Sequence, residues 1–149
     1  MIERIVQVEH SQPGVAVLTM TRPEKRNALS IELLRALENA ITQIQDDPAC
    51  RVMILRGEGL VFCAGLDLIE ASSPHNSEES AHALRRVLTL LRESRLVTIA
   101  AAHGGAYAGG AGLMAACDLA VATEDLKLGF PEIRRGLVPA LVSAVLASK

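Results

Sequence analysis

Two glycine-containing turns carry the residue pattern best suited to chemistry. The first turn spans residues 61–68 and the second turn spans residues 104–112. Each follows an apolar, strand-like run and is rich in small residues, so its backbone N–H groups are left uncovered by side chains. Two such turns that converge could hold one developing negative oxygen, which is the requirement for stabilising an oxyanion or an enolate. The pair therefore indicates acyl-transfer or enolate chemistry.

The second turn also has the features of an anion site at a helix start. If a helix begins near Gly109, its unpaired N–H groups and its dipole favour a negative group there. The alternative is a tight strand-to-helix connection that binds nothing. Residues 110–115 match a dinucleotide-binding fingerprint as well, but the preceding strand ends near Ala102, several residues too early. The acidic pair at 124–125 is also nearer than the ~20-residue spacing of that fingerprint, so nucleotide binding is disfavoured.

Glu132 is the candidate proton carrier. Its N-terminal neighbours, Phe130 and Pro131, are apolar and rigid. A partly desolvated carboxylate has a raised pKa and becomes a more useful acid or base. The alternative is a surface glutamate paired with Arg134 or Arg135, and the residues alone favour this alternative.

Charged residues near the turns have competing interpretations. Arg22, Lys25 and Arg26 share one loop and could hold a phosphate, although such clusters are more often solvated surface. Asp67 follows the first turn and could cap a short helix after it. His103 stands at the end of a predicted buried strand, where a hydrogen-bonded structural histidine is the favoured interpretation.

Composition narrows the class of protein. A length of 149 residues is about one domain, and half of the residues are apolar. With no Trp, one Tyr and two Phe, a core of Ala, Val, Leu and Ile is expected. The formal net charge is −2, from 15 basic and 17 acidic residues that are interspersed, so no nucleic-acid or membrane-surface partner is indicated.

The cysteines and the N-terminus bear on the compartment. Cys50, Cys63 and Cys117 lack metal-ligand spacing and are interpreted as thiols in a reducing compartment. No apolar run reaches the ~20 residues of a membrane span. The first residues lack the apolar region of a signal peptide. We therefore predict a cytoplasmic protein without a metal site.

The periodicity of apolar residues predicts the elements that position these turns. Alternation of apolar and polar residues predicts a hairpin of two strands, 2–9 and 15–20, with its turn at 11–14. Short apolar runs predict strands at 52–55, 96–102 and 119–122, the last two buried. Helical spacing predicts one helix from the cap Ser30 to residues 46–48, a second through Ala81, Leu84, Leu88 and Leu91, and others at 109–116 and 140–147. Residues 72–80 are expected to form a mobile loop, and 129–139 a connector. The alternation favours α/β layering in a single domain, residues 1–149.

Taken together, these segments resemble the crotonase superfamily, the enoyl-CoA hydratase/isomerase family. Residues 22–29 (RPEKRNAL) resemble its CoA-contact loop, residues 62–68 (FCAGLDL) its first oxyanion turn, and residues 104–118 its second. Pro131-Glu132 resembles its catalytic Pro-Glu step. Four motifs occur in family order and cover essentially the whole chain, so the resemblance is specific for the superfamily and less so for the reaction.

The resemblance implies an α/β fold, a crotonase-like spiral of repeated β-β-α units. It implies that the Leu66 and Gly109 N–H groups hold a thioester oxygen and that Glu132 is the general acid/base. Its substrate would be an acyl-CoA thioester, with no separate cofactor because CoA is part of the substrate. The residues expected to contact substrate or CoA are Lys25, Arg26, Ala28, Ala64, Gly65, Asp67, Leu68, Gly110 and Pro131. A full-length protein is expected to form a homotrimer or hexamer.

Two departures from the family pattern bear on the reaction. Typical hydratases carry a first catalytic glutamate where this chain has Gly112, whereas family isomerases manage with one carboxylate. The chain looks most similar to bacterial hydratases of the methylglutaconyl-CoA type at residues 109–113, Glu132 and residues 136–139. We therefore predict a hydratase, with a double-bond isomerase as the alternative. The family also continues into C-terminal helices beyond the equivalent of Lys149, so a truncated core is expected, and a non-catalytic CoA-binding fragment is the alternative from another class.

Overall fold

The computed structural model describes residues 5–131 and 140–147 of the chain. Strands and α-helices alternate along it, with two short 3-10 helices, η1 and η2. The elements are β1 (Val6–Gln12), β2 (Val15–Met20), η1 (Pro23–Lys25), α1 (Ile31–Asp46), β3 (Val52–Gly57), η2 (Glu70–Ser72), α2 (Pro74–Arg92), β4 (Val97–Ala102), β5 (Gly105–Tyr107), α3 (Gly109–Ala116), β6 (Leu119–Ala122), β7 (Lys127–Gly129) and α4 (Ala140–Leu146). This order agrees with the predicted α/β layering.

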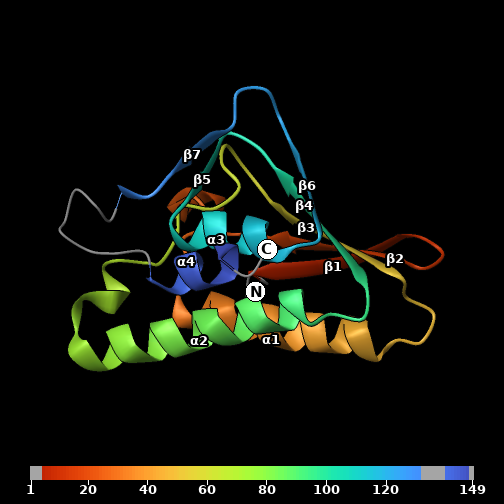
Figure 1. The fold of residues 1–149 in the computed structure, drawn as a ribbon, viewed down its shortest axis with the longest axis horizontal. Coiled ribbons are helices and arrows are strands. Elements are labelled where there is room, and N and C mark those ends of the chain that lie inside the picture. The colour runs from red at the N-terminus through yellow and green to blue at the C-terminus, as the bar shows by residue number, and fades with distance from the viewer. Residues whose placement is uncertain (1–4, 132–139, 148–149) are drawn as a thin grey trace.

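Two sheets and four α-helices make up the described fold. The main sheet has the order β1-β2-β3-β4-β6, and β5 pairs with β7 in a second, two-stranded sheet. Only β1 runs antiparallel to its neighbour; the other pairs are parallel. Helices α1 and α2 lie side by side along one side of the molecule, and α3 and α4 lie between them and the β5–β7 sheet (Figure 1). This arrangement brings the segment after β3 and the segment after β4 to the same region.

The predicted hairpin is present, but its turn is shorter than expected. Strand β1 continues to Gln12, so Ser11 and Gln12 belong to the strand and the turn is Pro13-Gly14. Gly14 has a φ of +80°, a conformation that glycine adopts without strain. Residues 2–4 of the predicted first strand lie outside the described residues.

Helix α1 begins and ends where the sequence predicts. The Ser30 hydroxyl accepts a hydrogen bond from the Leu33 N–H at 3.1 Å, which satisfies one of the donors exposed at a helix start. The buried face contains Leu33, Leu34, Leu37, Ala40, Ile41 and Ile44. These side chains belong to one hydrophobic core together with buried residues of β2 and β3, including Leu18, Met20, Met53 and Leu55.

The predicted mobile loop at residues 72–80 is wrong, because α2 begins at Pro74. The Ser73 hydroxyl accepts a hydrogen bond from the Asn76 N–H, and proline at the first helical position has a φ that suits a helix. The polar first turns of α2 are exposed, and burial begins at Ser80. The helix therefore begins seven residues before Ala81, the first residue of its apolar stripe, since the stripe marks only the buried part.

Strand β6 is not buried, contrary to the prediction. Leu119 is 56% exposed and Val121 is 64% exposed, because β6 is the edge strand of the main sheet. In β4, Thr98, Ala100 and Ala102 are buried, whereas Val97 is 46% exposed. An apolar run is thus correctly predicted as a strand here, but its two faces are not equally covered.

Candidate active site

The second turn connects β4 to α3 through β5. Helix α3 begins at Gly109, as predicted, and no acidic residue stands in its first turn. Ala108, at the N-cap, has a φ of +50°, which is uncommon for a residue with a side chain. Its N–H donates to the Gly129 carbonyl at 2.9 Å, and its own carbonyl accepts from the Gly112 N–H at 3.0 Å. These bonds fix the backbone from which the helix starts.

The first turn runs beside the second. The Phe62 N–H donates to the His103 carbonyl at 2.9 Å, and the Cys63 N–H donates to the Gly105 carbonyl at 3.1 Å. The Tyr107 N–H returns a bond to the Cys63 carbonyl at 3.0 Å. Segments far apart in sequence are therefore held together by backbone hydrogen bonds, whereas the convergence of the Leu66 and Gly109 N–H groups on one oxygen stays a prediction.

Glycine is required where the two turns touch. A Cβ atom added to Gly110 would lie 2.4 Å from the Cys63 carbonyl oxygen. Gly65 has a φ of +91°, and a Cβ atom on it would lie 2.8 Å from the Tyr107 carbonyl oxygen and 3.4 Å from the Gly109 nitrogen. The glycines of the two turns thus allow a close backbone approach that other residues would prevent.

Two backbone donors at this contact have no acceptor in the ranges 5–131 and 140–147. The Leu29 N–H donates to Gly65 at 2.8 Å and the Asp67 N–H donates to Leu29 at 3.1 Å, which is a parallel bridge between Leu29 and Leu66. In such a bridge the N–H of Leu66 itself points away from Leu29. Within the described part of the chain, neither the Leu66 N–H nor the Gly109 N–H has a hydrogen-bond acceptor.

The loop of residues 22–29 lies against the other side of the first turn. The Ala64 N–H donates to the Arg26 carbonyl at 3.0 Å, which continues the contacts of the Leu29–Leu66 bridge. Lys25 and Arg26 are exposed, and Ala28 and Ala64 are half-buried. The first turn is therefore placed between a loop that carries two exposed cations and the second turn.

Asn27 anchors this loop, and sequence reasoning missed it. Its Nδ2 donates to the carbonyls of Glu58, Val61 and Phe62 at 2.9, 3.1 and 3.1 Å, and its Oδ1 accepts from the Arg22 N–H at 3.0 Å. Asn27 is fully buried and has a φ of +52°. Asparagine tolerates this left-handed conformation better than most residues, which is the one local signal that marked the position.

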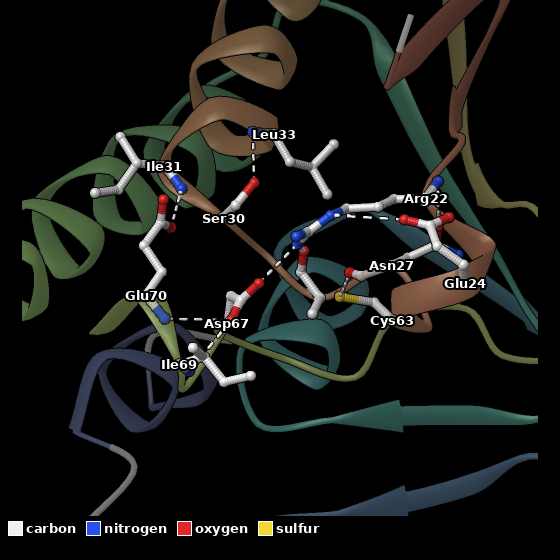
Figure 2. Close-up of polar contacts among 11 residues, drawn as sticks. Arg22, Glu24, Asn27, Ser30, Ile31, Leu33, Cys63, Asp67, Ile69 and Glu70 are labelled. Carbon is white, nitrogen blue, oxygen red and sulfur yellow. Dashed lines mark hydrogen bonds and ion pairs between the residues drawn. The ribbon is translucent and has the colours of Figure 1, made fainter. Parts of the chain in front are cut away.

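Arg22 does not point into solvent with Lys25 and Arg26. Its Nη1 donates to Asp67 Oδ2 at 2.9 Å and to the Ala28 carbonyl at 2.8 Å (Figure 2). The second oxygen of Asp67 accepts from the Ile69 and Glu70 N–H groups at 3.2 and 3.4 Å, as expected of a capping residue. We expected a short helix directly after Asp67. The chain instead forms a turn there, followed by the 3-10 helix η2.

The environment of Asp67 favours its charged form. Partial burial acts to raise the pKa of its carboxyl group, but the hydrogen bond from Arg22, the Glu70 N–H, the Arg22 charge and the Ile69 N–H together outweigh it. The pKa of Asp67 therefore lies below its ordinary value of 3.8. The Arg22–Asp67 pair is an ion pair at neutral pH, with side chains 19% and 15% exposed.

Cys63 is placed in the first turn but is not a nucleophile. Complete burial raises the pKa of its thiol to about 12, against a smaller lowering effect of the Gly65 backbone. Its Sγ contacts the Asn27 carbonyl oxygen at 3.2 Å. All three cysteines are buried free thiols, and the reducing compartment inferred from them stays a prediction. His103 is also structural, because its Nε2 lies 2.7 Å from the Gly59 carbonyl oxygen.

The remaining predicted site residues differ in exposure, and one of them lies outside the described residues. Gly110 is buried against Cys63, Leu68 is 53% exposed and Pro131 is exposed. Glu132 lies outside the described residues, as do residues 136–139, so the predictions made for them stay predictions. Gly129, close before Glu132 in sequence, accepts the hydrogen bond from Ala108 and so lies at the second turn.

Gly112 packs against the last helix. A Cβ atom on it would lie 2.9 Å from Val142 Cγ2, which is closer than side chains tolerate, and 3.6 Å from Leu88 Cδ2. Val142, on α4, is 3% exposed. A side chain at residue 112 would therefore require the Val142 side chain on α4 to shift.

The described residues contain neither a metal site nor a membrane span. No group of three or more His, Cys, Asp or Glu in these ranges is arranged to hold a metal ion. No helix of the described chain is both long and apolar enough to cross a membrane.

Comparison with known proteins gives a consistent result. The sequence pattern of the enoyl-CoA hydratase/isomerase family matches residues 10–149. Enoyl-CoA hydratase EchA19 of Mycobacterium tuberculosis is 40% identical over 134 residues, which cover 87% of this chain and 50% of that protein. The mitochondrial methylglutaconyl-CoA hydratase of Mus musculus is 35% identical over 139 residues, which cover 91% of this chain and 44% of that protein. A crystal structure of an enoyl-CoA hydratase of Mycobacterium smegmatis matches with a TM-score of 0.91 and 33% identity, over 97% of this chain and 57% of that one.

The fold is that of the crotonases, an α/β fold that solved enoyl-CoA hydratases share. The chain belongs to the enoyl-CoA hydratase/isomerase family, whose named relatives are enzymes. It spans about half the length of the curated relatives it matches. The predicted family and fold class are thus confirmed, whereas the reaction and the roles of individual residues need an argument of their own.

Proposed function

We propose that this chain forms the core of an enoyl-CoA hydratase, which adds water to an α,β-unsaturated acyl-CoA thioester. The observation that carries the proposal is a pair of N–H groups, Leu66 and Gly109, on two backbones in contact, neither of which has an acceptor among the described residues. Donors arranged in advance of the reaction stabilise an oxygen on which negative charge develops. The thioester carbonyl oxygen of an enoyl-CoA is such an atom.

In the proposed reaction the water oxygen bonds to C3 of the acyl group. The π electrons of the C2–C3 double bond move toward the thioester oxygen, giving an enolate that accepts hydrogen bonds from Leu66 and Gly109. Glu132 takes the proton from the attacking water and delivers it to C2, which restores the thioester carbonyl. Gly109 and Gly110 are buried, so water has less access to the thioester oxygen on their side.

Binding of the CoA portion is assigned to the exposed loop and to the first turn. Lys25 and Arg26 are the exposed cations of the loop of residues 22–29 and would lie near the CoA phosphates. Ala28, Ala64, Gly65, Asp67 and Leu68, with Gly110 and Pro131 beside the second turn, would line the path of the substrate. The pantetheine arm carries no charge, so small and apolar neighbours suit it.

A second candidate, double-bond isomerisation, is favoured by the packing of Gly112. Helix α4 occupies the space that a side chain at this position would need, since a Cβ atom would lie 2.9 Å from Val142 Cγ2. The carboxylate that the family's hydratases place here therefore has no counterpart. A single glutamate is sufficient to move a proton between two carbons, whereas hydration requires another group to orient the water.

One experiment separates these reactions from mere binding. Calorimetric titration with a short 2-enoyl-CoA measures binding, and turnover in oxygen-labelled water measures chemistry on the same sample. Labelled oxygen at C3 supports the hydratase, and double-bond migration without label supports the isomerase. Binding without either product identifies a non-catalytic CoA-binding piece and refutes the proposed activity. The assembly as a homotrimer or hexamer and the cytoplasmic location stay predictions.

A further inference from the structure

We propose that Arg22 is a positioning residue that fixes the direction of the Leu66 N–H. The residue joins the loop of residues 22–29 to the first turn (Figure 2). Its effect on turnover rests on the proposed function, but its effect on the backbone does not. Nothing local in the sequence marks this role, because Arg22 and Asp67 are 45 residues apart.

The two acceptors of Arg22 flank the bridge that orients Leu66. Ala28 directly precedes Leu29, and Asp67 directly follows Leu66. A single nitrogen atom, Nη1, therefore joins the backbone carbonyl of Ala28 to the side-chain carboxylate of Asp67, at 2.8 and 2.9 Å. The Leu29–Leu66 bridge itself consists of two backbone hydrogen bonds, and Arg22 adds a side-chain link directly beside it.

Each end of this link is itself fixed. The Asp67 carboxylate also accepts from the Ile69 and Glu70 N–H groups, so it cannot follow a displaced arginine. The Arg22 backbone N–H donates to Asn27 Oδ1, and Asn27 is bound to three carbonyls. The guanidinium therefore connects two anchored points, and a link of this kind transmits position rather than merely adding an ion pair.

Leu66 depends on this link because its N–H faces away from the bridge. The peptide units on either side of Leu66 are those that carry the Gly65 carbonyl and the Asp67 N–H, both bonded to Leu29. Rotation of the Gly65–Leu66 peptide unit would change the direction of the Leu66 N–H, and the bonds to Leu29 on both sides of Leu66 restrain that rotation. Arg22 opposes that rotation from the Asp67 side, and the contact of Gly65 with Gly109 opposes it from the other.

The first test compares variants of the ion pair by steady-state kinetics with a short 2-enoyl-CoA. Arg22→Met keeps the length and removes both hydrogen bonds, so kcat should fall by about 10–100-fold while KM changes little. Arg22→Lys should recover part of the loss, since a lysine reaches one acceptor but not both. Asp67→Asn should resemble Arg22→Met, and the double variant should be no worse than either single variant.

The matched control is Arg86→Met, which removes an arginine–carboxylate pair between α1 and α2. Arg86 Nε donates to both oxygens of Glu38 at 3.0 and 3.1 Å, far from the two turns in sequence. This variant should retain wild-type kcat. A positioning role is overturned if Arg22→Met retains wild-type kcat, or if its kcat loss is matched by Arg86→Met.

A second measurement separates this inference from the proposed function. Amide hydrogen exchange at Leu66, measured by NMR spectroscopy, should change in Arg22→Met while amides of the α1 interior, such as Ile41, keep their wild-type rates. If the wild type shows no turnover, the proposed function fails and the exchange comparison alone decides the role of Arg22. Unchanged exchange at Leu66 in a folded Arg22→Met variant would overturn the inference.

Discussion

Gly65→Ala tests the contact between the two turns with the smallest change. The new Cβ atom would lie 2.8 Å from the Tyr107 carbonyl oxygen, about 0.6 Å short of the 3.4 Å at which ordinary contact begins. The turns must therefore separate, and the same Cβ atom would lie 3.4 Å from the Gly109 nitrogen. A left-handed backbone adds roughly 1–2 kcal/mol of strain in a residue other than glycine. A displacement of this size between two oxyanion donors should lower kcat by about 10–100-fold.

Gly14→Ala is the matched control for this change. Gly14 lies in the hairpin turn and has a similar φ of +80°. A Cβ atom on it would lie 3.4 Å from the Ala49 carbonyl oxygen, which is an ordinary contact distance. Both variants should lose stability in denaturant unfolding, and only Gly65→Ala should lose turnover of a 2-enoyl-CoA, followed by the absorbance of the conjugated thioester. If Gly65→Ala keeps the kcat of Gly14→Ala, the spacing of the turns has no catalytic role.

Further predictions concern the loop, the buried thiol and the proton carrier. Replacing Lys25 and Arg26 by Met should raise KM for CoA esters, more at low salt than at high salt; equal KM values at low ionic strength would contradict phosphate binding. Asn27→Ala should lower the free energy of unfolding by about 3 kcal/mol, because three carbonyls lose their donor, and chemical denaturation measures it. Cys63 has a raised pKa, so its proton is kept on folding while the unfolded thiol ionises above pH 9. Stability should therefore fall from pH 9 toward pH 12 by up to about 1.4 kcal/mol per pH unit, and Cys63→Ala should lack this component. Glu132→Gln should reduce kcat by roughly 10²–10⁴ with little change in binding; full activity in that variant would remove Glu132 from the mechanism.

The elements that sequence predicts well are those whose signals are local. The apolar stripe and the Ser30 cap are sufficient to define α1 at both ends. For α2 the stripe gives only the buried part, because nothing apolar marks a solvated first turn, although Ser73 and Pro74 are recognisable start signals. The run at 119–122 predicts a strand, but its exposure depends on β6 being the edge of the sheet, which is a property of the topology.

The candidate site also has features that local sequence predicts and features that depend on the tertiary fold. Small residues after strands indicate where backbone N–H groups are uncovered, so the two turns could be found from the sequence. Their contact through Gly65 could be expected but not located, since it depends on how β3, β4 and β5 are arranged. The roles of Asn27 and Arg22 are set by partners far along the chain, and no spacing rule relates an arginine to an aspartate 45 residues away.

The central claim is that the Leu66 and Gly109 N–H groups hold the thioester oxygen. Infrared difference spectroscopy of a 2-enoyl-CoA carrying a carbon-13 label at the thioester carbonyl measures this directly, because hydrogen bonds that polarise the carbonyl lower its stretching frequency. We predict a lower frequency for the bound ester than for the ester in water, and a smaller shift for Gly109→Pro, which lacks one donor. A bound ester whose carbonyl frequency equals that in water, in a sample where calorimetry shows saturation, would contradict the account.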